Sequence, residues 1–145
     1  ELARAQAWRE RIAVLEEARA ARSYPEVRAM HDVTEGGMAT ALHELSIAGG
    51  HRLRVDLDRI PVLPETRRIC DLLGLHPLGL IGSGSLLICC GPEAVAQLLG
   101  DLAARGIPAR EIGAVLERGE GVEAWRGVER AALPEFAVYE ITRLF

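Results

Sequence analysis

The stretch MHDVTEGGMATALHEL, residues 30–45, decides how the rest of the chain is interpreted. Its second half has the apolar spacing of an amphipathic helix, carried by Met38, Ala41, Leu42 and Leu45. Directly before this pattern stand two adjacent glycines, Gly36 and Gly37. Each glycine inside a helix costs about 1 kcal/mol relative to alanine. The pair therefore needs a reason beyond helix formation.

One reason is chemical. The amides at a helix N-terminus, together with the helix dipole, favour an anion, and glycines let a phosphate approach the backbone closely. The polar residues Asp32, Thr34 and Glu35 precede the glycines. Two carboxylates repel a bare phosphate, but they suit a magnesium–nucleotide whose metal ion bridges them. This interpretation predicts a phosphate or substrate site at residues 32–37, where an alanine at Gly37 would obstruct the ligand.

The other reason is structural. Asp32 can act as the N-cap of the helix with Glu35 three residues later, which resembles a capping box. Gly36 and Gly37 then serve close packing of the helix on a sheet. A glycine-rich turn alone is a weak motif, so the residues by themselves favour this structural explanation.

A second glycine-rich segment, GLIGSGSLL, spans residues 79–87. Its Ser83 and Gly84 can belong to a concave anion-binding loop. Composition alone favours an ordinary tight turn before a strand.

Alternating helix and strand patterns predict an α/β (α+β) sandwich with helices over one mixed sheet. Its centre is a ferredoxin-like βαβ…βαβ core with an added helix. The expected helices cover residues 2–20, 35–48, 64–73 and 92–105. The expected strands cover residues 27–31, 53–57, 86–90 and 112–116. A turn with a weak strand or hairpin is expected in 117–129, and a short helix or arm in 134–145. The uninterrupted apolar run Leu86–Cys90 indicates a central strand.

Composition excludes several function classes. The 145 residues suffice for one domain, and the net charge of −4 argues against a nucleic-acid surface. No apolar run reaches the roughly 18 residues of a membrane span, and the chain starts without a leader pattern.

The three cysteines form no C-x-x-C, the histidines show no metal spacing, and no catalytic triad can be assigned. A cytoplasmic protein is expected. Because the chain begins at Glu1 without methionine, it is expected to be a piece of a longer protein.

Three segments together carry a family resemblance. AMHDVTEGGMATALHEL (29–45), IPVLPETRRICDLLGLHPLGLIGSGSLLICC (60–90) and IGAVLERG (112–119) resemble the C-terminal domain of the aminoimidazole ribonucleotide (AIR) synthase-related superfamily. The branch it resembles most is that of the hydrogenase maturation protein HypE and its relatives. The resemblance implies a C-terminal domain over residues 27–145. Residues 1–26 would be a helix and linker from an ATP-binding domain that is missing here.

Members of this superfamily are ATP-dependent enzymes, and the resemblance implies ATP and Mg²⁺ for the full-length protein. The family signature Asp-x-Thr-x-Gly-Gly falls on Asp32, Thr34, Gly36 and Gly37, facing a cleft. This favours a functional reason for the glycines. Most nucleotide contacts would lie in the missing N-terminal domain, so residues 1–145 alone should be inactive and hold no cofactor tightly. The resemblance allows a homodimer and binding to maturation partners; neither nucleic acid nor membrane is expected.

Two departures from the HypE pattern bear on function. HypE-type chains end in Pro-Arg-Ile-Cys, whose cysteine carries the carbamoyl group, whereas this chain ends EITRLF. Ser83-Gly84 stands where some HypE-type sequences carry Glu-Gly. The expected function is an ATP-dependent enzyme that activates an acyl, carbamoyl or phosphoryl substrate, with catalytic residues unassigned. The alternative is a non-catalytic binding or assembly module in metallocentre maturation, favoured by the missing cysteine.

Overall fold

A computed structural model describes residue 6 and residues 12–145. The described helices are α2 (Leu15–Arg22), α3 (Gly37–Gly49), α4 (Pro64–Leu73) and α5 (Pro92–Ala104). The strands are β1 (Val27–Asp32), β2 (His51–Asp56), β3 (Leu86–Cys90), β4 (Gly113–Arg118), β5 (Val122–Arg126) and β6 (Glu129–Ala131). Short 3-10 turns are η2 (Leu57–Arg59), η3 (Pro77–Gly79) and η4 (Glu140–Leu144). None of these described helices is long and apolar enough to cross a membrane.

The strands form two sheets, and the expectation of one mixed sheet is corrected. β1 and β3 pair antiparallel as a two-stranded ribbon. The other four strands form a mixed sheet in the order β4-β2-β5-β6, in which β2 runs parallel to β5 and antiparallel to β4. The α/β class itself is confirmed, and so is the hairpin expected in 117–129, formed by β5 and β6.

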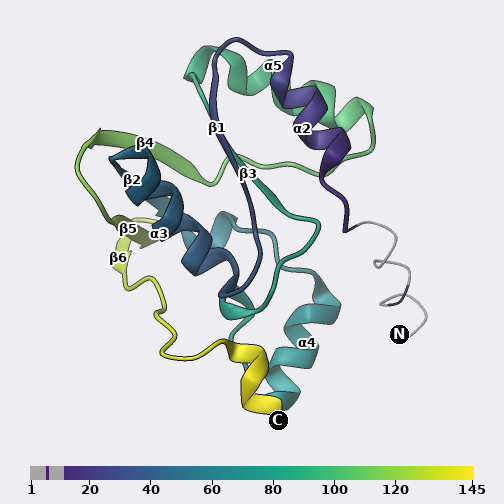
Figure 1. The fold of residues 1–145 in the computed structure, drawn as a ribbon, viewed down its shortest axis with the longest axis vertical. Coiled ribbons are helices and arrows are strands. Elements are labelled where there is room, and N and C mark those ends of the chain that lie inside the picture. Colours follow the sequence, from purple (N-terminus) through teal and green to yellow (C-terminus); the bar gives the residue numbers. More distant parts are fainter. Residues whose placement is uncertain (1–5, 7–11) are drawn as a thin grey trace.

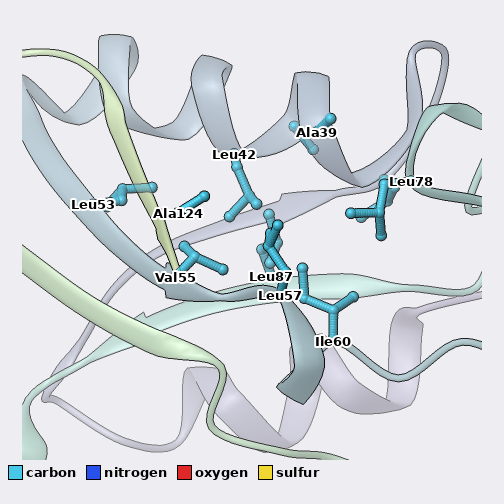
Figure 2. Close-up of a cluster of buried hydrophobic side chains, with 11 residues drawn as sticks. Ala39, Leu42, Leu53, Val55, Leu57, Ile60, Leu78, Leu87 and Ala124 are labelled. Atoms are coloured by element: carbon cyan, nitrogen blue, oxygen red, sulfur yellow. The ribbon is translucent and has the colours of Figure 1, made fainter. Parts of the chain in front are cut away.

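The main core lies between α3 and the four-stranded sheet (Figure 2). Ala39 and Leu42 on α3 face Leu53 and Val55 on β2 and Ala124 on β5. Arg52 and Arg54, which alternate with these β2 residues, are more exposed. This is the alternation expected of a strand with one solvated face. The helix is fixed to the sheet by Ser46, whose fully buried hydroxyl donates to His51 O at 2.7 Å and accepts from Gly121 N–H at 2.8 Å.

A second apolar cluster lies at the other end of the molecule, where α2 packs on α5 (Figure 1). Its buried members include Ala21, Leu98 and Leu102. The β1–β3 ribbon runs between the two clusters, so β3 sends Leu87 to the main core and Ile88 to the second cluster. An apolar residue is therefore needed on both faces of this strand.

Two expectations about elements were wrong in part. The run Leu86–Cys90 is a strand, but it pairs with β1 alone and is not central; its apolar character reflects the two clusters on its two faces. Part of the helix expected over residues 2–20, namely residues 2–5 and 7–11, lies outside the described residues. Within the described part, residues 12–14 are not helical and α2 begins at Leu15.

Candidate functional site

The two glycine-rich segments, far apart in the sequence, lie against each other. Asp32, the last residue of β1, is paired in register with Leu86 at the start of β3. The Val33 N–H donates to Ser85 O at 3.1 Å, and the Ser85 N–H closes a turn onto Gly82 O at 2.9 Å. A Cβ on Gly82 would lie 2.6 Å from Val33 Cγ1, so this glycine permits the close approach. The turn at residues 32–37, named here the glycine turn, therefore shares one edge with the loop at residues 82–85.

The two glycines that open α3 both have left-handed backbone conformations, with φ of +80° for Gly36 and +68° for Gly37. A Cβ on Gly37 would lie 2.5 Å from both Leu78 O and Leu80 O. The glycines are thus required by backbone conformation and by packing of α3 against the η3 turn. The idea that alanine at Gly37 affects only a ligand assumes helical dihedrals, and the positive φ contradicts it.

The capping-box explanation is wrong. The N-cap of α3 is Gly36, and no side chain caps the helix. The local hydrogen bond is instead a backbone one, from Gly37 N–H to Thr34 O at 3.1 Å. Because the first amides of a helix lack an acceptor within it, the N–H groups of Met38 and Ala39 need an acceptor from outside the helix.

The carboxylates of the turn remain exposed to solvent. Glu35 makes no hydrogen bond or ion pair with any other described residue, and Asp32 has His31 Nδ1 as its neighbour at 3.8 Å. The Nε2 atom of His31 lies 2.9 Å from Glu44 on α3, so this histidine is engaged mainly by the helix. A His31–Asp32 base–acid pair is therefore not formed at hydrogen-bonding distance.

Beside the glycine turn lies a hollow of about 290 Å³. Its polar groups come from Thr66, Ser83 and Ser85, and its remaining walls are mostly apolar side chains of the η2–α4 segment and the η3 loop. Ser83 is exposed at this loop, and the neighbouring Gly84 has φ of +93°. Of the expected residues, Ser83 alone lines this hollow. The others lie outside its lining: Gly84 in the 82–85 loop, and Asp32, Thr34, Glu35, Gly36 and Gly37 in the glycine turn, which the Val33–Ser85 hydrogen bond joins to that loop.

Sequence reasoning missed several residues of this region. Gly82 and Ser85 belong to the same GLIGSGS segment as Ser83, so its glycine spacing could have indicated them. The contribution of α4, through Thr66 and Ile69, has no local signal, because only the tertiary fold brings that helix beside the loop.

The carboxylates of this region can be compared with the ligands that a magnesium–nucleotide requires. The described residues contain no group of three or more His, Cys, Asp or Glu side chains that could hold a metal ion by themselves. Asp32 and Glu35 provide two exposed carboxylates near a helix start. Mg²⁺ commonly takes one or two carboxylates and completes its shell with substrate phosphates and water. The residues present therefore fit a metal that arrives with a phosphate ligand and do not fit a resident metal centre.

The cysteines offer no activated nucleophile. Cys70 on α4 is 1 % exposed, while Cys89 and Cys90 are partly exposed. Burial raises the pKa of each of these three thiols. A raised pKa keeps a thiol protonated at neutral pH, and the protonated form is a poor nucleophile.

A second hollow, of about 470 Å³, lies on the solvated face of the four-stranded sheet. There Trp125 has the guanidinium groups of Arg54 and Arg130 each 5.7 Å from its ring. Glu123 forms ion pairs with Arg52, Arg54 and Arg130. On this surface the carboxylate of Glu123 is already paired with arginines.

Comparison with known proteins agrees with the sequence resemblance. The chain is 42 % identical over 99 residues to carbamoyl dehydratase HypE of Cupriavidus necator, an alignment that covers 66 % of this chain and 28 % of that protein. Its structure is similar to the crystal structure of Escherichia coli HypE, a hydrogenase maturation protein. The TM-score is 0.72, the identity is 31 %, and the match covers 85 % of this chain and 40 % of that one.

A further similar structure is HypE in complex with ATP. Its TM-score is 0.66 at 26 % identity, and it covers 77 % of this chain and 37 % of that one. The chain thus spans well under half the length of the HypE proteins that it matches. The model of the AIR synthase related protein, C-terminal domain, matches residues 3–126. This chain therefore belongs to the AIR synthase related proteins and contains their C-terminal domain.

Proposed function

We propose that this domain supplies the phosphate-facing wall of an ATP-dependent site in a HypE-like protein. The observation that carries the proposal is the meeting of the glycine turn and the 82–85 loop, fixed by the Val33–Ser85 hydrogen bond of 3.1 Å. Two segments with anion-binding character become one surface there. A relative solved with ATP supports the nucleotide as ligand.

The roles follow from chemistry. The Met38 amide would donate to a phosphate oxygen, because a helix N-terminus favours an anion. Asp32 and Glu35 would hold a Mg²⁺ ion that accompanies the phosphates, and this ion would offset the charge of the carboxylates. Ser83, which lines the hollow, would donate its hydroxyl to the same ligand. Bound Mg²⁺–ATP would supply the activating phosphoryl group.

The substrate is proposed to be a small acyl, carbamoyl or phosphoryl acceptor, in a protein that takes part in hydrogenase metallocentre maturation. The similarity to proteins named carbamoyl dehydratase and hydrogenase maturation protein supports this class. Most nucleotide contacts, and other maturation proteins as partners, are assigned to the rest of a full-length protein.

A chimera tests the proposal. Residues 27–145 replace the matching segment of Cupriavidus necator HypE, and Mg²⁺–ATP affinity and ATP hydrolysis are measured. Asp32→Asn is expected to weaken Mg²⁺–ATP binding by about tenfold, the usual effect of removing a charged partner. Asp71→Asn is the matched control, because Asp71 is an exposed carboxylate on α4 outside the hollow. Equal affinity and hydrolysis in the parent chimera and both variants would show that the turn has no role in nucleotide binding.

A further inference from the structure

The C-terminal part of the chain is fixed to the η3 turn by a buried carboxylate. The Glu140 residue is 4 % exposed. Its Oε2 atom accepts the His76 N–H at 2.6 Å, and Arg143 Nη1 donates to both carboxylate oxygens at 2.9 and 3.1 Å. A carboxylate with these partners is a strong acceptor, because hydrogen bonds to ionised groups are about twice as strong as neutral ones.

The same segment also packs against the loop through an aromatic ring. The Phe136 ring lies 5.6 Å from the His76 ring. A Cβ on Gly79 would be 2.6 Å from Glu140 Cγ and 2.7 Å from Phe136 Cζ. Gly79 is thus enclosed by the C-terminal segment, and the η3 turn has little room to move on that side. Phe136, Glu140 and Arg143 are named here the latch.

The other side of the η3 turn touches the glycine turn. A Cβ on Gly37 would lie only 2.5 Å from the carbonyl oxygens of Leu78 and Leu80. Within residues 76–80, His76 Nδ1 accepts the Leu78 N–H at 3.2 Å. This hydrogen bond fixes the position of Leu78, whose carbonyl oxygen faces Gly37. A continuous set of contacts therefore leads from Glu140 through residues 76–80 to Gly37.

The conformation of Gly37 and the burial of Glu140, at the two ends of these contacts, each need a physical reason. Gly37 has a left-handed backbone conformation, and no side chain caps its helix. The glycine turn therefore depends on packing against another segment to keep this conformation. The latch buries this carboxylate and pairs it with a backbone amide and with Arg143. Burying a charge is costly unless it is paired and hydrogen-bonded, so its placement on this loop calls for a reason.

We propose that the latch holds the η3 turn against Gly37 and so fixes the glycine turn in its anion-binding conformation, with Glu140 as a positioning residue. The part of this inference that concerns the ligand rests on the proposed function. Glu140 does not touch the phosphate site; it acts through the backbone of residues 76–80.

Amide hydrogen exchange of the 145-residue chain tests the coupling without any ligand. In Glu140→Ala, exchange at the His76, Gly79 and Gly37 amides is expected to rise about tenfold or more, because a charged hydrogen bond is lost. Amides of the β1–β3 ribbon, such as Ile88, are expected to stay as in the wild type. Glu140→Gln keeps an oxygen acceptor and should restore most of the protection. Glu135→Ala, an exposed residue of the same segment, is the matched control and should change nothing.

If Glu140→Ala does not fold, Arg143→Ala provides the milder variant and should give the same pattern with a smaller rise. An unchanged Gly37 amide in the folded variant would overturn the proposal. So would a uniform rise across the whole chain, since that would reveal a general loss of stability without directed coupling.

Titration with inorganic phosphate in the presence of Mg²⁺, followed through the Met38 amide shift, tests the consequence for binding. Affinity is expected to fall about tenfold in Glu140→Ala and to stay close to wild type in Glu140→Gln. Equal affinity in all variants, alongside altered exchange, would reduce Glu140 to a stabilising residue and overturn the positioning role. If the wild type itself shows no phosphate shifts, the proposed function of the turn fails, and the exchange experiment still decides on the latch.

Discussion

Gly37 has a structural role that does not depend on any ligand. Its φ is +68°, and two carbonyl oxygens lie 2.5 Å from the position that a Cβ would take, so there is no room for a side chain. The Asp-x-Thr-x-Gly-Gly motif locates this glycine in the sequence. It could not reveal why glycine is needed, because dihedral angles and the approach of residues 78–80 are properties of the tertiary fold.

Gly37→Ala is therefore expected to destabilise the chain by about 2–4 kcal/mol, the combined cost of a left-handed alanine and of overpacking. Gly49→Ala, in the last turn of the same helix with open space around it, is the matched control. It should stabilise by about 0.5–1 kcal/mol. Urea unfolding of both variants measures the difference, and a Gly37→Ala variant as stable as the wild type would show that the turn is not held as described.

The titratable side chains of His76 and Glu140 predict a dependence of stability on pH. Burial lowers the pKa of His76 below its ordinary 6.5, with a smaller lowering from Arg126 and an opposing effect of Glu140. The unfolded chain therefore binds this proton first, and stability falls as pH drops below about 6.5. Burial alone would raise the pKa of Glu140, but hydrogen bonds from His76 N–H and Arg143 outweigh it and lower the pKa below its ordinary 4.5. Its contribution is present above about pH 4.5 and is lost as pH falls through the lower folded value.

Urea unfolding between about pH 7.5 and about pH 4 measures these two contributions. His76→Asn keeps an acceptor for the Leu78 N–H and should flatten the upper part of the profile. Glu140→Gln should flatten the lower part, while Glu135→Gln should leave the profile unchanged. Wild-type stability that rises steadily on acidification would contradict both pKa directions.

At the scale of elements, the contact between α3 and the four-stranded sheet depends on one buried hydroxyl. Ser46 Oγ bonds to His51 O at 2.7 Å and to the Gly121 N–H at 2.8 Å, so it joins the helix to the start of β2 and to the turn before β5. Ser46→Ala leaves these backbone groups without their partner and is expected to cost about 1–3 kcal/mol. Ser23→Ala at the exposed end of α2 also removes a hydroxyl that donates to a backbone oxygen, Ala20 O at 2.7 Å, but water can replace this donor, so the cost should be about 0.5–1 kcal/mol. Equal thermal unfolding of the two variants would contradict the role of Ser46.

Helices and strands were largely predictable because their signals are local. Pro64 and Gly74 bound α4 as the sequence indicates, and Pro92 begins α5. The pairing of strands was not predictable in the same way. β3 has the apolar run of a central strand, but the run arises from two clusters on opposite faces of a ribbon, and nothing local distinguishes these cases.

At the scale of the whole molecule, two apolar clusters joined by the β1–β3 ribbon suggest two regions of different stability (Figure 1). Leu98→Ala removes a buried side chain from the second cluster and is expected to cost about 2–5 kcal/mol. Its effect on amide exchange should centre on α2 and α5, and the glycine turn should keep its protection. Leu42→Ala in the main core is the matched comparison and should expose the glycine turn as well. The same exchange pattern in both variants would mean that the clusters unfold as one unit.

The candidate site was predictable as two separate motifs and not as one surface. Asp32, Thr34, Glu35, Gly36 and Gly37 are consecutive or nearly so, and Ser83 and Gly84 carry a similar glycine-rich signal. Their meeting depends on the antiparallel register of β1 with β3 and on the glycine at position 82. Register depends on the patterns of both paired strands together, so neither motif taken alone reveals that the two loops meet.

The central claim is that the glycine turn and the 82–85 loop form one phosphate-binding surface. The most direct measurement is a residue-resolved NMR titration of the 145-residue chain with Mg²⁺ and pyrophosphate. The account predicts weak binding, with a dissociation constant of the order of 1 mM. Shifts should be confined to residues 34–39 and 82–85, and Asp32→Asn should reduce them while Asp71→Asn does not. Absence of shifts in these segments, or shifts centred on Arg52, Arg54 and Arg130 of the outer sheet face, would contradict it.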